Sequence, residues 1–491
     1  MNARTRAGRL GLIAAVAVTL AATAPTASAD TQRPAGRTLE DDFNGDGYAD
    51  VAFAAPDATV DGKKQAGYVA VMYGSADGLK KSSRQVFSQN APGMPGVAEQ
   101  GDAYGSAVTT ADLDGDGYAD LVVGSAGEND ETVGTDTGSL AVIWGGAKGL
   151  ATSTTLLTGT EAYEGIGGKV VAGDFDGDGH RDLATVSGSH DLKVLSGPFG
   201  RDGKAAGTRV VKDEFDSRIL DLASGDLNGD GVTDIAAAMN DGDEYDARRV
   251  AYWQGTKGSG PAPYKVVTKA DGGRLQGGEN LDIGDVDGDG FGDIVVGRAV
   301  DGYDSDLDTP LAKGGMVTFL PGGAGGPDVS RAHSFNQDSK GVPGVAEAGD
   351  GFGAGVSVGD IDGDGRADVS VGVRNETFDR KKKAGAVVTL RGSKSGLTAS
   401  GSQVLSQDTP GVPGVAESGD TFGTATKLAD TDGDGRADLV VGAPGENEEA
   451  GSVWVLPSTA SGVNPKGSFT FGAGTLGTVA AGAKLGGAFN F

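Results

Sequence analysis

Short runs of apolar residues alternate with glycine-rich polar segments along nearly the whole chain. Each run is four or five residues long, as in Leu121–Gly124, Leu140–Trp144, Leu439–Gly442 and Val453–Leu456. Runs of this length, rich in Val and Leu and bounded by turn residues, are typical of β-strands covered on both faces. After the first thirty residues, no stretch has the periodicity of an amphipathic helix. The pattern therefore predicts an all-β protein.

An acidic motif of the form D-x-[DN]-x-D-G-x-x-D recurs seven times, starting at residues 42, 112, 174, 226, 285, 360 and 430. Each copy precedes an apolar run, a polar loop and a second apolar run. Intervals of roughly 50 to 75 residues accommodate a four-stranded sheet with its loops, so each interval can form one blade. We predict a seven-bladed β-propeller, with an open β-solenoid as the alternative.

The two ends of the repeat region complement each other. The first acidic motif has no Phe-Gly segment before it, whereas a surplus segment, 469–491, follows the seventh unit. Within this tail, Val479–Ala480 and Leu485–Ala488 resemble Val97–Ala98 and Tyr104–Ala107, which precede the second motif. We therefore expect the C-terminal tail to supply the strand that the first unit lacks. Closing the ring in this way removes exposed strand edges.

The acidic motif has the composition of a calcium loop. Positions 1, 3, 5 and 9 offer side-chain oxygens, position 7 offers a backbone carbonyl, and Gly at position 6 permits a sharp turn. Calcium takes about six to eight oxygen ligands. An EF-hand would need Glu at position 12, but that position holds Phe53, Val123, Thr185, Ala237, Val296, Val371 and Val441. The loop therefore joins two strands, and we predict up to seven calcium ions, required for stability.

The predicted calcium ligands, loop by loop, are Asp42, Asn44, Asp46, Tyr48 and Asp50; Asp112, Asp114, Asp116, Tyr118 and Asp120; Asp174, Asp176, Asp178, His180 and Asp182; Asp226, Asn228, Asp230, Val232 and Asp234; Asp285, Asp287, Asp289, Phe291 and Asp293; Asp360, Asp362, Asp364, Arg366 and Asp368; and Asp430, Asp432, Asp434, Arg436 and Asp438. The position-7 residue of each loop is included for its carbonyl alone.

The N-terminus has the pattern of a cleaved signal peptide. Three arginines precede the apolar stretch Leu10–Ala22, and Ala27–Ala29 offers a small-x-small cleavage site. A membrane anchor is the alternative, but the apolar run is short and no stop-transfer charges follow it. The expected divisions are a signal peptide at 1–29, cleaved near Ala29, a short polar segment at 30–38, and one propeller at 39–491. We expect the mature protein to be secreted, with no membrane span.

Composition narrows the choice of partners. The chain contains 88 Gly and no Cys, and its formal charge is −28. Without Cys, stability must come from the core and from metals. Loss of the three signal-peptide arginines takes the charge to −31, which argues against nucleic acid and anionic lipid as partners.

The seventh unit resembles the FG-GAP repeat of integrin alpha-subunit propellers and their bacterial relatives. It contains Phe422-Gly423, the acidic loop, and then Val441–Pro444. Phe352-Gly353 and Tyr104-Gly105 repeat the first element, Ile166-Gly167 matches it weakly, and units four and five have no clear Phe-Gly. The resemblance implies a calcium-binding propeller. It also implies that the calcium loops share one face, while partners bind the opposite face.

That opposite face would hold three nearly identical segments, 92–102, 342–350 and 410–420. They mark a binding surface, or their Pro-Gly turns only set the geometry between blades; both interpretations stay open. The longer loops 240–249 and 301–313 are further candidates for ligand contact.

Catalytic signals are few. The lack of Cys excludes thiol nucleophiles, and His180, His190 and His333 have no paired His at metal spacing, so we expect all three to be exposed. We predict no enzyme but a secreted calcium-binding module for adhesion to an extracellular protein or glycan. The alternatives are a carboxylate-dependent hydrolase or lyase acting on polysaccharide at the propeller channel, and a structural envelope protein. The ligand and the oligomeric state are left open.

Overall fold

The computed structural model describes Met1 and residues 41–490, apart from 214–216, 241–247, 271 and 305–307. The predicted signal peptide and the segment 30–38 lie outside the described residues, as do parts of the loops 240–249 and 301–313. Residues 38–491 form one structural unit. Within the described part of the chain, none of the helices has the length and apolar character needed to cross a membrane.

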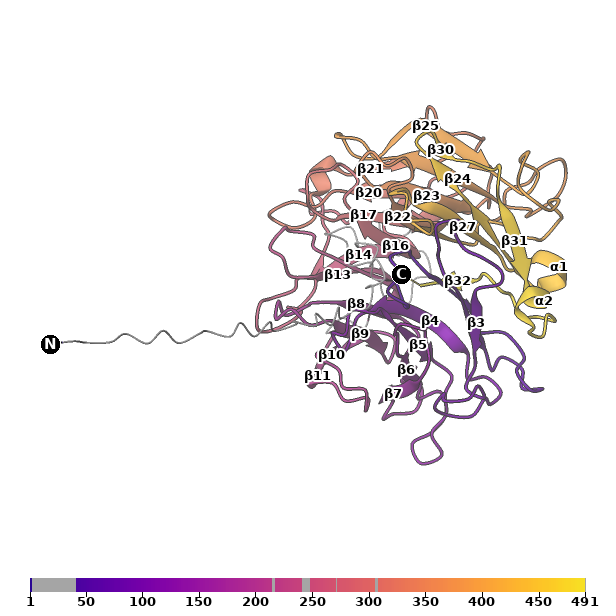
Figure 1. The fold of residues 1–491 in the computed structure, drawn as a ribbon. Coiled ribbons are helices and arrows are strands. Elements are labelled where there is room, and N and C mark those ends of the chain that lie inside the picture. The colour runs from indigo at the N-terminus through magenta and orange to yellow at the C-terminus, as the bar shows by residue number, and fades with distance from the viewer. Residues whose placement is uncertain (2–40, 214–216, 241–247, 271, 305–307, 491) are drawn as a thin grey trace. The chain divides into compact units, whose positions relative to one another are not determined.

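The described residues form seven four-stranded antiparallel sheets, which are the predicted blades (Figure 1). From the inner to the outer strand, the blades are β32 (Ala488–Phe489), β1 (Val51–Ala55), β2 (Tyr68–Met72) and β3 (Arg84–Phe87) in blade 1; β4 (Tyr104–Ala111), β5 (Asp120–Ser125), β6 (Ser139–Ile143) and β7 (Ser153–Thr158) in blade 2; β8 (Val170–Gly173), β9 (Asp182–Ser187), β10 (Asp191–Ser196) and β11 (Gly207–Val211) in blade 3; β12 (Arg218–Gly225), β13 (Asp234–Asn240), β14 (Arg248–Trp253) and β15 (Lys265–Val266) in blade 4; β16 (Asn280–Gly284), β17 (Asp293–Arg298), β20 (Met316–Leu320) and β21 (His333–Phe335) in blade 5; β22 (Phe352–Gly359), β23 (Asp368–Val373), β24 (Ala386–Arg391) and β25 (Thr398–Leu405) in blade 6; and β26 (Ala425–Ala429), β27 (Asp438–Ala443), β28 (Ser452–Leu456) and β31 (Phe469–Gly472) in blade 7.

The described residues also form small elements outside the seven four-stranded sheets. They are the two-stranded ribbons β18 (Tyr303–Asp304) with β19 (Thr309–Pro310) and β29 (Ser458–Thr459) with β30 (Gly462–Val463), the 3-10 turn Val329–Arg331, and the one-turn helices α1 (Glu446–Glu449) and α2 (Ala473–Leu476). The scarcity of helix in the described residues confirms the all-β prediction.

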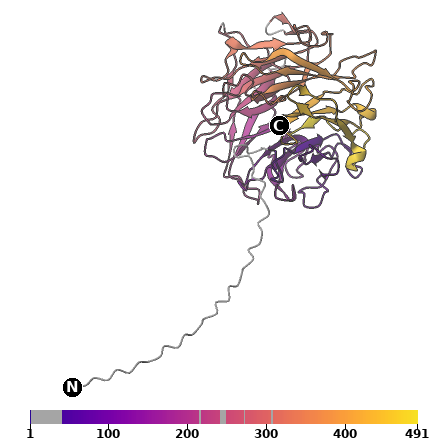
Figure 2. The same ribbon diagram turned by 45° about the horizontal axis from the view of Figure 1, so that its top comes forward.

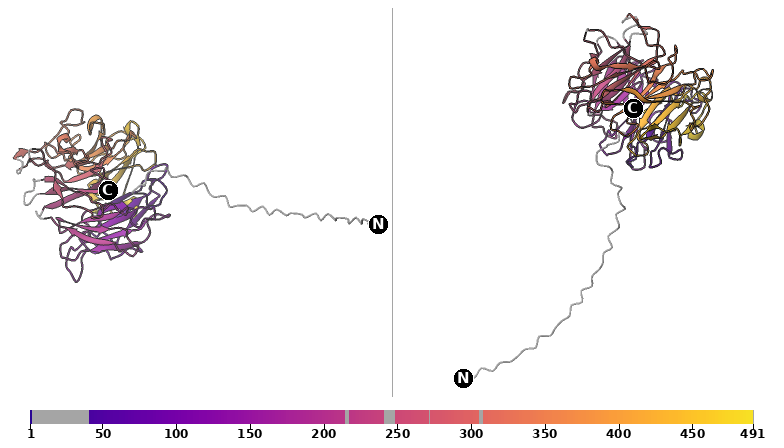
Figure 3. Two further views of the ribbon diagram at one scale, coloured as in Figure 1. Left: turned by 90° about the vertical axis from the view of Figure 1, so that its left-hand side faces the viewer. Right: turned by 90° about the horizontal axis from the view of Figure 1, so that it is seen from above.

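The blades close into a ring. The inner strands contact one another in the order β4, β8, β12, β16, β22, β26 and β32, and the ring is completed by β1, which pairs with β32 and contacts β4. Figures 2 and 3 show the same succession, with the last, yellow blade beside the first, indigo one. Hydrophobic clusters lie between neighbouring blades; one combines Val387 of blade 6 with Phe422 and Trp454 of blade 7. The seven-bladed propeller is confirmed.

The C-terminal end closes the ring as expected. Strand β32 pairs antiparallel with β1, and Asn490 Oδ1 accepts the backbone N–H of Ala52 at 3.1 Å. The Phe489 ring is buried and lies edge-on to Phe53. One part of the expectation was wrong: Phe469–Gly472 is not surplus but forms β31, the outer strand of blade 7. The seventh unit needs that fourth strand to cover its third strand, so the residues that close the ring come after it.

Close packing between blades explains why Gly recurs after the acidic loops. A Cβ at Gly442 would lie 1.8 Å from the carbonyl oxygen of Gly486, and one at Gly372 equally close to that of Gly423. Any side chain there would therefore push the second strand of one blade away from the inner strand of the next. Ile166 makes the same kind of parallel bridge to the preceding loop as Phe422 does, so it occupies the Phe position of the repeat.

Successive strands of each blade are antiparallel, so loops alternate between two edges of the ring. The metal-loop rim consists of the seven acidic loops and the turns between third and fourth strands. The connector rim consists of the loops between second and third strands and the connectors between blades, which include 88–103, 336–351, 406–421 and 477–487. Backbone bonds join the parts of the connector rim; for example, the Ala103 N–H donates to the Gln65 carbonyl at 2.9 Å.

Candidate metal centres

The first Asp of each acidic loop organises the loop backbone. In the second loop, Asp112 Oδ1 accepts the N–H groups of Gly115 and Asp116, and Asp112 Oδ2 accepts that of Gly117, at 2.8–3.1 Å. Gly115 and Gly117 have φ values of 74° and 91°, which L side chains rarely adopt. The chain therefore curls around position 1, and the carboxylates at alternate positions face inward.

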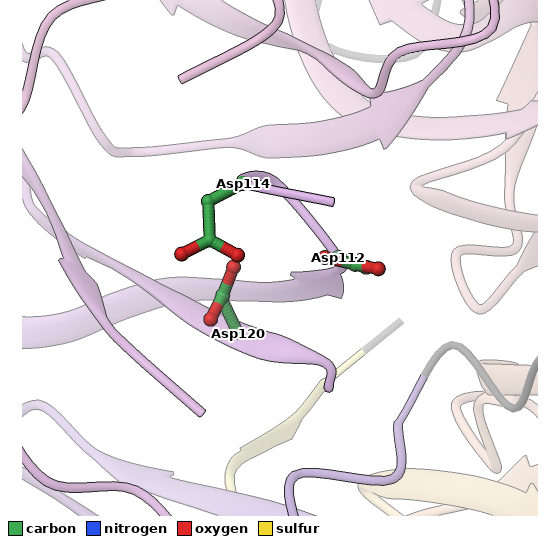
Figure 4. A group of neighbouring side chains, drawn as sticks. All are labelled: Asp112, Asp114 and Asp120. Carbon is green, nitrogen blue, oxygen red and sulfur yellow. The ribbon is translucent and has the colours of Figure 1, made fainter. Parts of the chain in front are cut away.

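Five described loops bring three carboxylates within 4.8 Å of one another. Positions 1, 3 and 9 converge in the second, third and sixth loops, and positions 1, 3 and 5 in the fifth and seventh. In the first and fourth loops, position 3 is Asn44 or Asn228. Figure 4 shows Asp114 and Asp120 turned toward each other from the loop and from the start of β5, with Asp112 beside them. These oxygen-only donor sets suit a hard cation such as calcium.

The position-9 Asp holds each loop against its blade. Asp120 Oδ2 accepts the N–H of Leu113 at 3.0 Å, and Asp120 Oδ1 accepts that of Gly145, beyond the third strand, at 2.8 Å. The first six loops repeat both contacts; in the seventh, the Thr431 hydroxyl replaces the first donor. This Asp is buried in every blade.

Burial disfavours the charged form of these seven carboxyls. First burial, and then mostly the neighbouring loop carboxylates, raise the pKa to about 9 for Asp50, about 7 for Asp120 and about 6 for Asp182, Asp234, Asp293, Asp368 and Asp438. A bound divalent cation reverses this effect, because it favours the charged carboxylate. The predicted donor set therefore fits calcium, and the role of each residue as a ligand stays a prediction.

The acidic loops also contact one another around the ring. The Ala119 N–H at position 8 of the second loop donates to the Asp42 carbonyl at position 1 of the first, at 3.0 Å. The same bond joins Ala49 of the first loop to Asp430 of the seventh, at 3.1 Å. The position-7 residues were predicted as ligands through their carbonyls alone; the Tyr118 side chain also lies against Gly45 of the preceding loop. Binding at one loop can therefore affect its neighbours.

Arginines that the sequence analysis did not identify contact the carboxylates of several acidic loops. Arg201 Nη2 donates to Asp116 Oδ2 at 2.6 Å, its Nε contacts Asp114, and its guanidinium lies 5.5 Å from the Trp144 ring centroid. Arg331 contacts Asp287 of the fifth loop at 3.1 Å, and Arg391 contacts Asp362 of the sixth at 2.8 Å. These residues are distant from the loops in sequence, and no local pattern identifies them.

A second set of carboxylates repeats on the connector rim. In three blades a buried Gln amide donates to a half-buried Glu, at 2.5–2.6 Å: Gln89 to Glu128, Gln337 to Glu376 and Gln407 to Glu446. In each blade a buried Asp (Asp102, Asp350 or Asp420) accepts the N–H of the Glu three residues before it. Burial, with help from neighbouring carboxylates, raises the pKa of Glu128 and Glu446 to about 7.

The three histidines differ from one another. His180 is exposed, as expected, whereas the prediction of exposure was wrong for His190 and His333, which are half-buried. The His333 ring packs against Phe319, and its Nε2 lies 2.9 Å from the Leu397 carbonyl. The outer strand of blade 5 places this ring against its own blade and the next one.

Comparisons with known proteins identify the repeat in the sequence. A model of the FG-GAP repeat matches residues 104–143, 352–390 and 422–456, and a model of an FG-GAP-like repeat matches residues 42–123. The phosphatidylinositol-glycan-specific phospholipase D of Rattus norvegicus is 29% identical over 198 residues, covering 38% of this chain and 22% of that protein. Integrin alpha pat-2 of Caenorhabditis briggsae is 32% identical over 247 residues, covering 48% and 19%. The match thus spans about a fifth of each relative. A solved structure, the Dos1 propeller, aligns over 69% of this chain and 67% of its own, at 12% identity and a TM-score of 0.36.

Proposed function

This chain belongs to the FG-GAP family of integrin alpha-like β-propellers, and on that basis we propose that it is a secreted, calcium-binding module. Its role is non-catalytic binding or adhesion to an extracellular protein or glycan. The signal-peptide pattern supports export, and the seven acidic loops support calcium binding. Calcium holds the metal-loop rim, which leaves the connector rim to contact a partner.

A row of exposed valines on the connector rim is the observation that carries the proposal. Val345, Val415 and Val97 occupy the same position in three nearly identical connectors, and their exposed fractions are 68%, 63% and 65%. Val479, in the connector before β32, is 50% exposed. These connectors serve the consecutive blades 6, 7, 1 and 2. Contiguous exposed apolar surface marks interaction sites, and we take this repeated row of valines as the candidate contact surface.

The central channel favours binding over catalysis. A cavity of about 80 Å³ lies among the inner strands of blades 1 to 4. Its Asp221 pairs with Lys169 at 3.1 Å and also accepts the Leu281 N–H, so that carboxylate is already neutralised. Asp282 is the one observation that favours the hydrolase or lyase alternative, because burial raises its pKa to about 6. Its oxygens, however, accept the N–H groups of Val358 and Ile283.

The similarity to phospholipase D does not by itself favour catalysis here. The matched region is 22% of that protein, and the phospholipase activity in its name belongs to the whole protein. An activity assay on polysaccharide with the wild type and with Asp282→Asn addresses the alternative directly. Turnover that the substitution abolishes would replace the binding proposal with a catalytic one.

The proposal is tested by retention on immobilised protein. Residues 30–491 are coupled in calcium and exposed to envelope fractions and medium of the producing cells, then washed with chelator. We expect a defined protein or polysaccharide to be retained in calcium and released by chelation. A variant with Ser at Val97, Val345, Val415 and Val479 should lose retention, whereas a control with Ser at Val210 and Val404 should keep it. Equal retention by both variants, or none by the calcium-loaded wild type, contradicts the proposal.

A further inference from the structure

The repeats allow the same place to be compared in three blades. In blade 7, the Trp454 side chain fills the space between the third strand and the connector. It is buried, its ring lies edge-on to Phe422 at 5.4 Å, and its Nε1 donates to the Pro413 carbonyl at 2.8 Å. Strand register places Val388 of blade 6 and Ala141 of blade 2 at the same position. Blade 2 therefore has the smallest side chain where blade 7 has the largest.

Blade 2 has a cavity at this place. It measures about 230 Å³, and its walls include Pro95, Gly96 and Ala141, the counterparts of Pro413, Gly414 and Trp454. Its polar walls include Gln89, Tyr104, Glu128 and Asp130. Blade 2 thus keeps the connector of its relatives but lacks the side chain that closes it.

Two buried polar atoms at this cavity have no protein partner. The Tyr104 hydroxyl is one of them, although the side chain is only 1% exposed. Tyr104 replaces Phe352 and Phe422 of blades 6 and 7 and so adds a hydroxyl in blade 2, where this cavity lies. The Gln89 Oε1 atom is the other; its side chain is 5% exposed, and its Nε2 donates to Glu128. The equivalent atoms Gln337 Oε1 and Gln407 Oε1 are also unpaired, so the Tyr104 hydroxyl is the atom that distinguishes blade 2. An unpaired buried polar atom costs about 1–3 kcal/mol, so a ligand that pairs both would relieve that cost.

The lining selects the charge of the ligand. Among the described residues that line the cavity there is no Lys or Arg, whereas Glu128 and Asp130 contribute carboxylates. Asp102 adds a further negative charge next to Glu128. An anion is therefore excluded. A primary ammonium group has three N–H donors and no acceptor, which matches the Glu128 carboxylate, Gln89 Oε1 and the Tyr104 oxygen, while Pro95 and Ala141 offer apolar contact for an alkyl stem.

We propose that the cavity of blade 2 binds a primary ammonium group on an alkyl chain. The source is either the lysine side chain of a protein partner or a free small amine. The proposal deepens the binding function proposed above and rests on it for the biological partner. The cavity itself is separate from the exposed valines, none of which lines it.

The test uses n-butylamine and Nα-acetyl-lysine N-methylamide as probes and 1-pentanol as the neutral control. Binding to the protein in saturating calcium is measured by ligand-observed NMR titration. We expect saturable binding of butylamine, at least about tenfold tighter than that of pentanol. Binding of the lysine derivative as well assigns the site to a lysine side chain, and binding of butylamine alone assigns it to a free amine.

Two variants copy what the other blades already contain. Ala141→Trp fills the cavity as Trp454 does and should abolish butylamine binding. Tyr104→Phe should weaken it about tenfold, the loss of one hydrogen bond to a charged group. Because both residues occur at these positions in blades 6 or 7, each variant should fold with a melting temperature in calcium no lower than that of the wild type, and Tyr104→Phe should melt slightly higher because it removes an unpaired buried hydroxyl.

Three results would overturn the proposal: no saturable amine binding by the wild type, equal binding by Ala141→Trp, or pentanol binding as tight as that of butylamine. None of these bears on retention through the exposed valines, so failure of the ammonium site and failure of the proposed binding function can be told apart.

Discussion

The metal-loop rim and the connector rim both carry buried carboxylates, but different groups surround them. On the metal-loop rim, Asp120 converges with Asp112 and Asp114, and the three carboxylates lie within 4.8 Å of one another. On the connector rim, Asp350 accepts the N–H of Glu347, and Glu376 accepts the amide of Gln337. The first arrangement gathers negative charge around one point. The second brings no three carboxylates together in this way among the described residues, and each of its two carboxylates accepts a donor from the chain.

This difference indicates which rim requires a cation. Like charges held this close repel unless a cation or protons neutralise them. The metal-loop rim has only partial compensation, from backbone N–H groups and from arginines such as Arg201. The stability of the metal-loop rim should therefore depend on calcium, and that of the connector rim on pH.

Removal of calcium should have the largest effect. At a hundred times the dissociation constant, each filled site adds about 2.7 kcal/mol to the free energy of unfolding, and neighbouring loops are joined by backbone bonds. We expect chelation to lower the melting temperature by more than about 10 °C. Calorimetry in calcium, in chelator and in magnesium measures this. A melting temperature unaffected by chelator contradicts the assignment of the acidic loops to calcium.

A matched pair of Asp→Asn substitutions separates the two rims. Asp120→Asn should cost about 2–4 kcal/mol in calcium, because the amide cannot accept both N–H groups and is a weaker ligand. In chelator the cost should be smaller, since the raised pKa of Asp120 already disfavours its charge. Asp350→Asn should cost about 1 kcal/mol or less in either condition. Denaturant unfolding provides the four values; equal calcium dependence of both variants would remove the distinction between the rims.

The sequence predicts the metal-loop rim better than the connector rim. The predicted ligands of one loop lie within nine residues, so spacing alone places Asp112, Asp114 and Asp120 together. The closing strand β32 was also predictable, because Leu485–Ala488 resembles Tyr104–Ala107, the segment that precedes the second acidic motif. By contrast, Gln89 meets Glu128 across two blades, and Arg201 reaches a loop 85 residues earlier. Such contacts depend on how the blades pack against one another. The spacing of residues along the sequence does not determine that packing.

A pH titration sharpens the comparison on the connector rim. Burial and Asp420 raise the pKa of Glu446 to about 7, above the value of about 4.3 in an unfolded chain. The folded state thus binds more protons between these values, so this group lowers stability as pH rises from about 4.3 to 7. In saturating calcium, the melting temperature of Glu446→Gln should lie about 1–2 °C above that of the wild type at pH 8. At pH 5 the two melting temperatures should be equal. The exposed Glu131→Gln, whose carboxylate is not among those that raise the pKa of Glu446, is the control. The same upward shift in that variant would contradict the assignment.

Within the metal-loop rim, Arg201 allows a finer comparison, with the smallest expected effect. Its guanidinium contacts Asp114 and Asp116. We therefore expect it to stabilise the loop when calcium is absent and to compete with calcium for the same carboxylates. Arg201→Gln should cost less than about 1 kcal/mol in chelator, as exposed ion pairs do. It should also tighten calcium binding at the second loop severalfold, because one positive charge is removed beside the site. Isothermal titration calorimetry measures the calcium affinity of Arg201→Gln and of the control variant Lys204→Gln. The control removes a nearby positive charge that pairs with Asp202 and not with the loop. Weaker calcium binding by Arg201→Gln would mean that the arginine positions the ligands for the cation rather than competing with it.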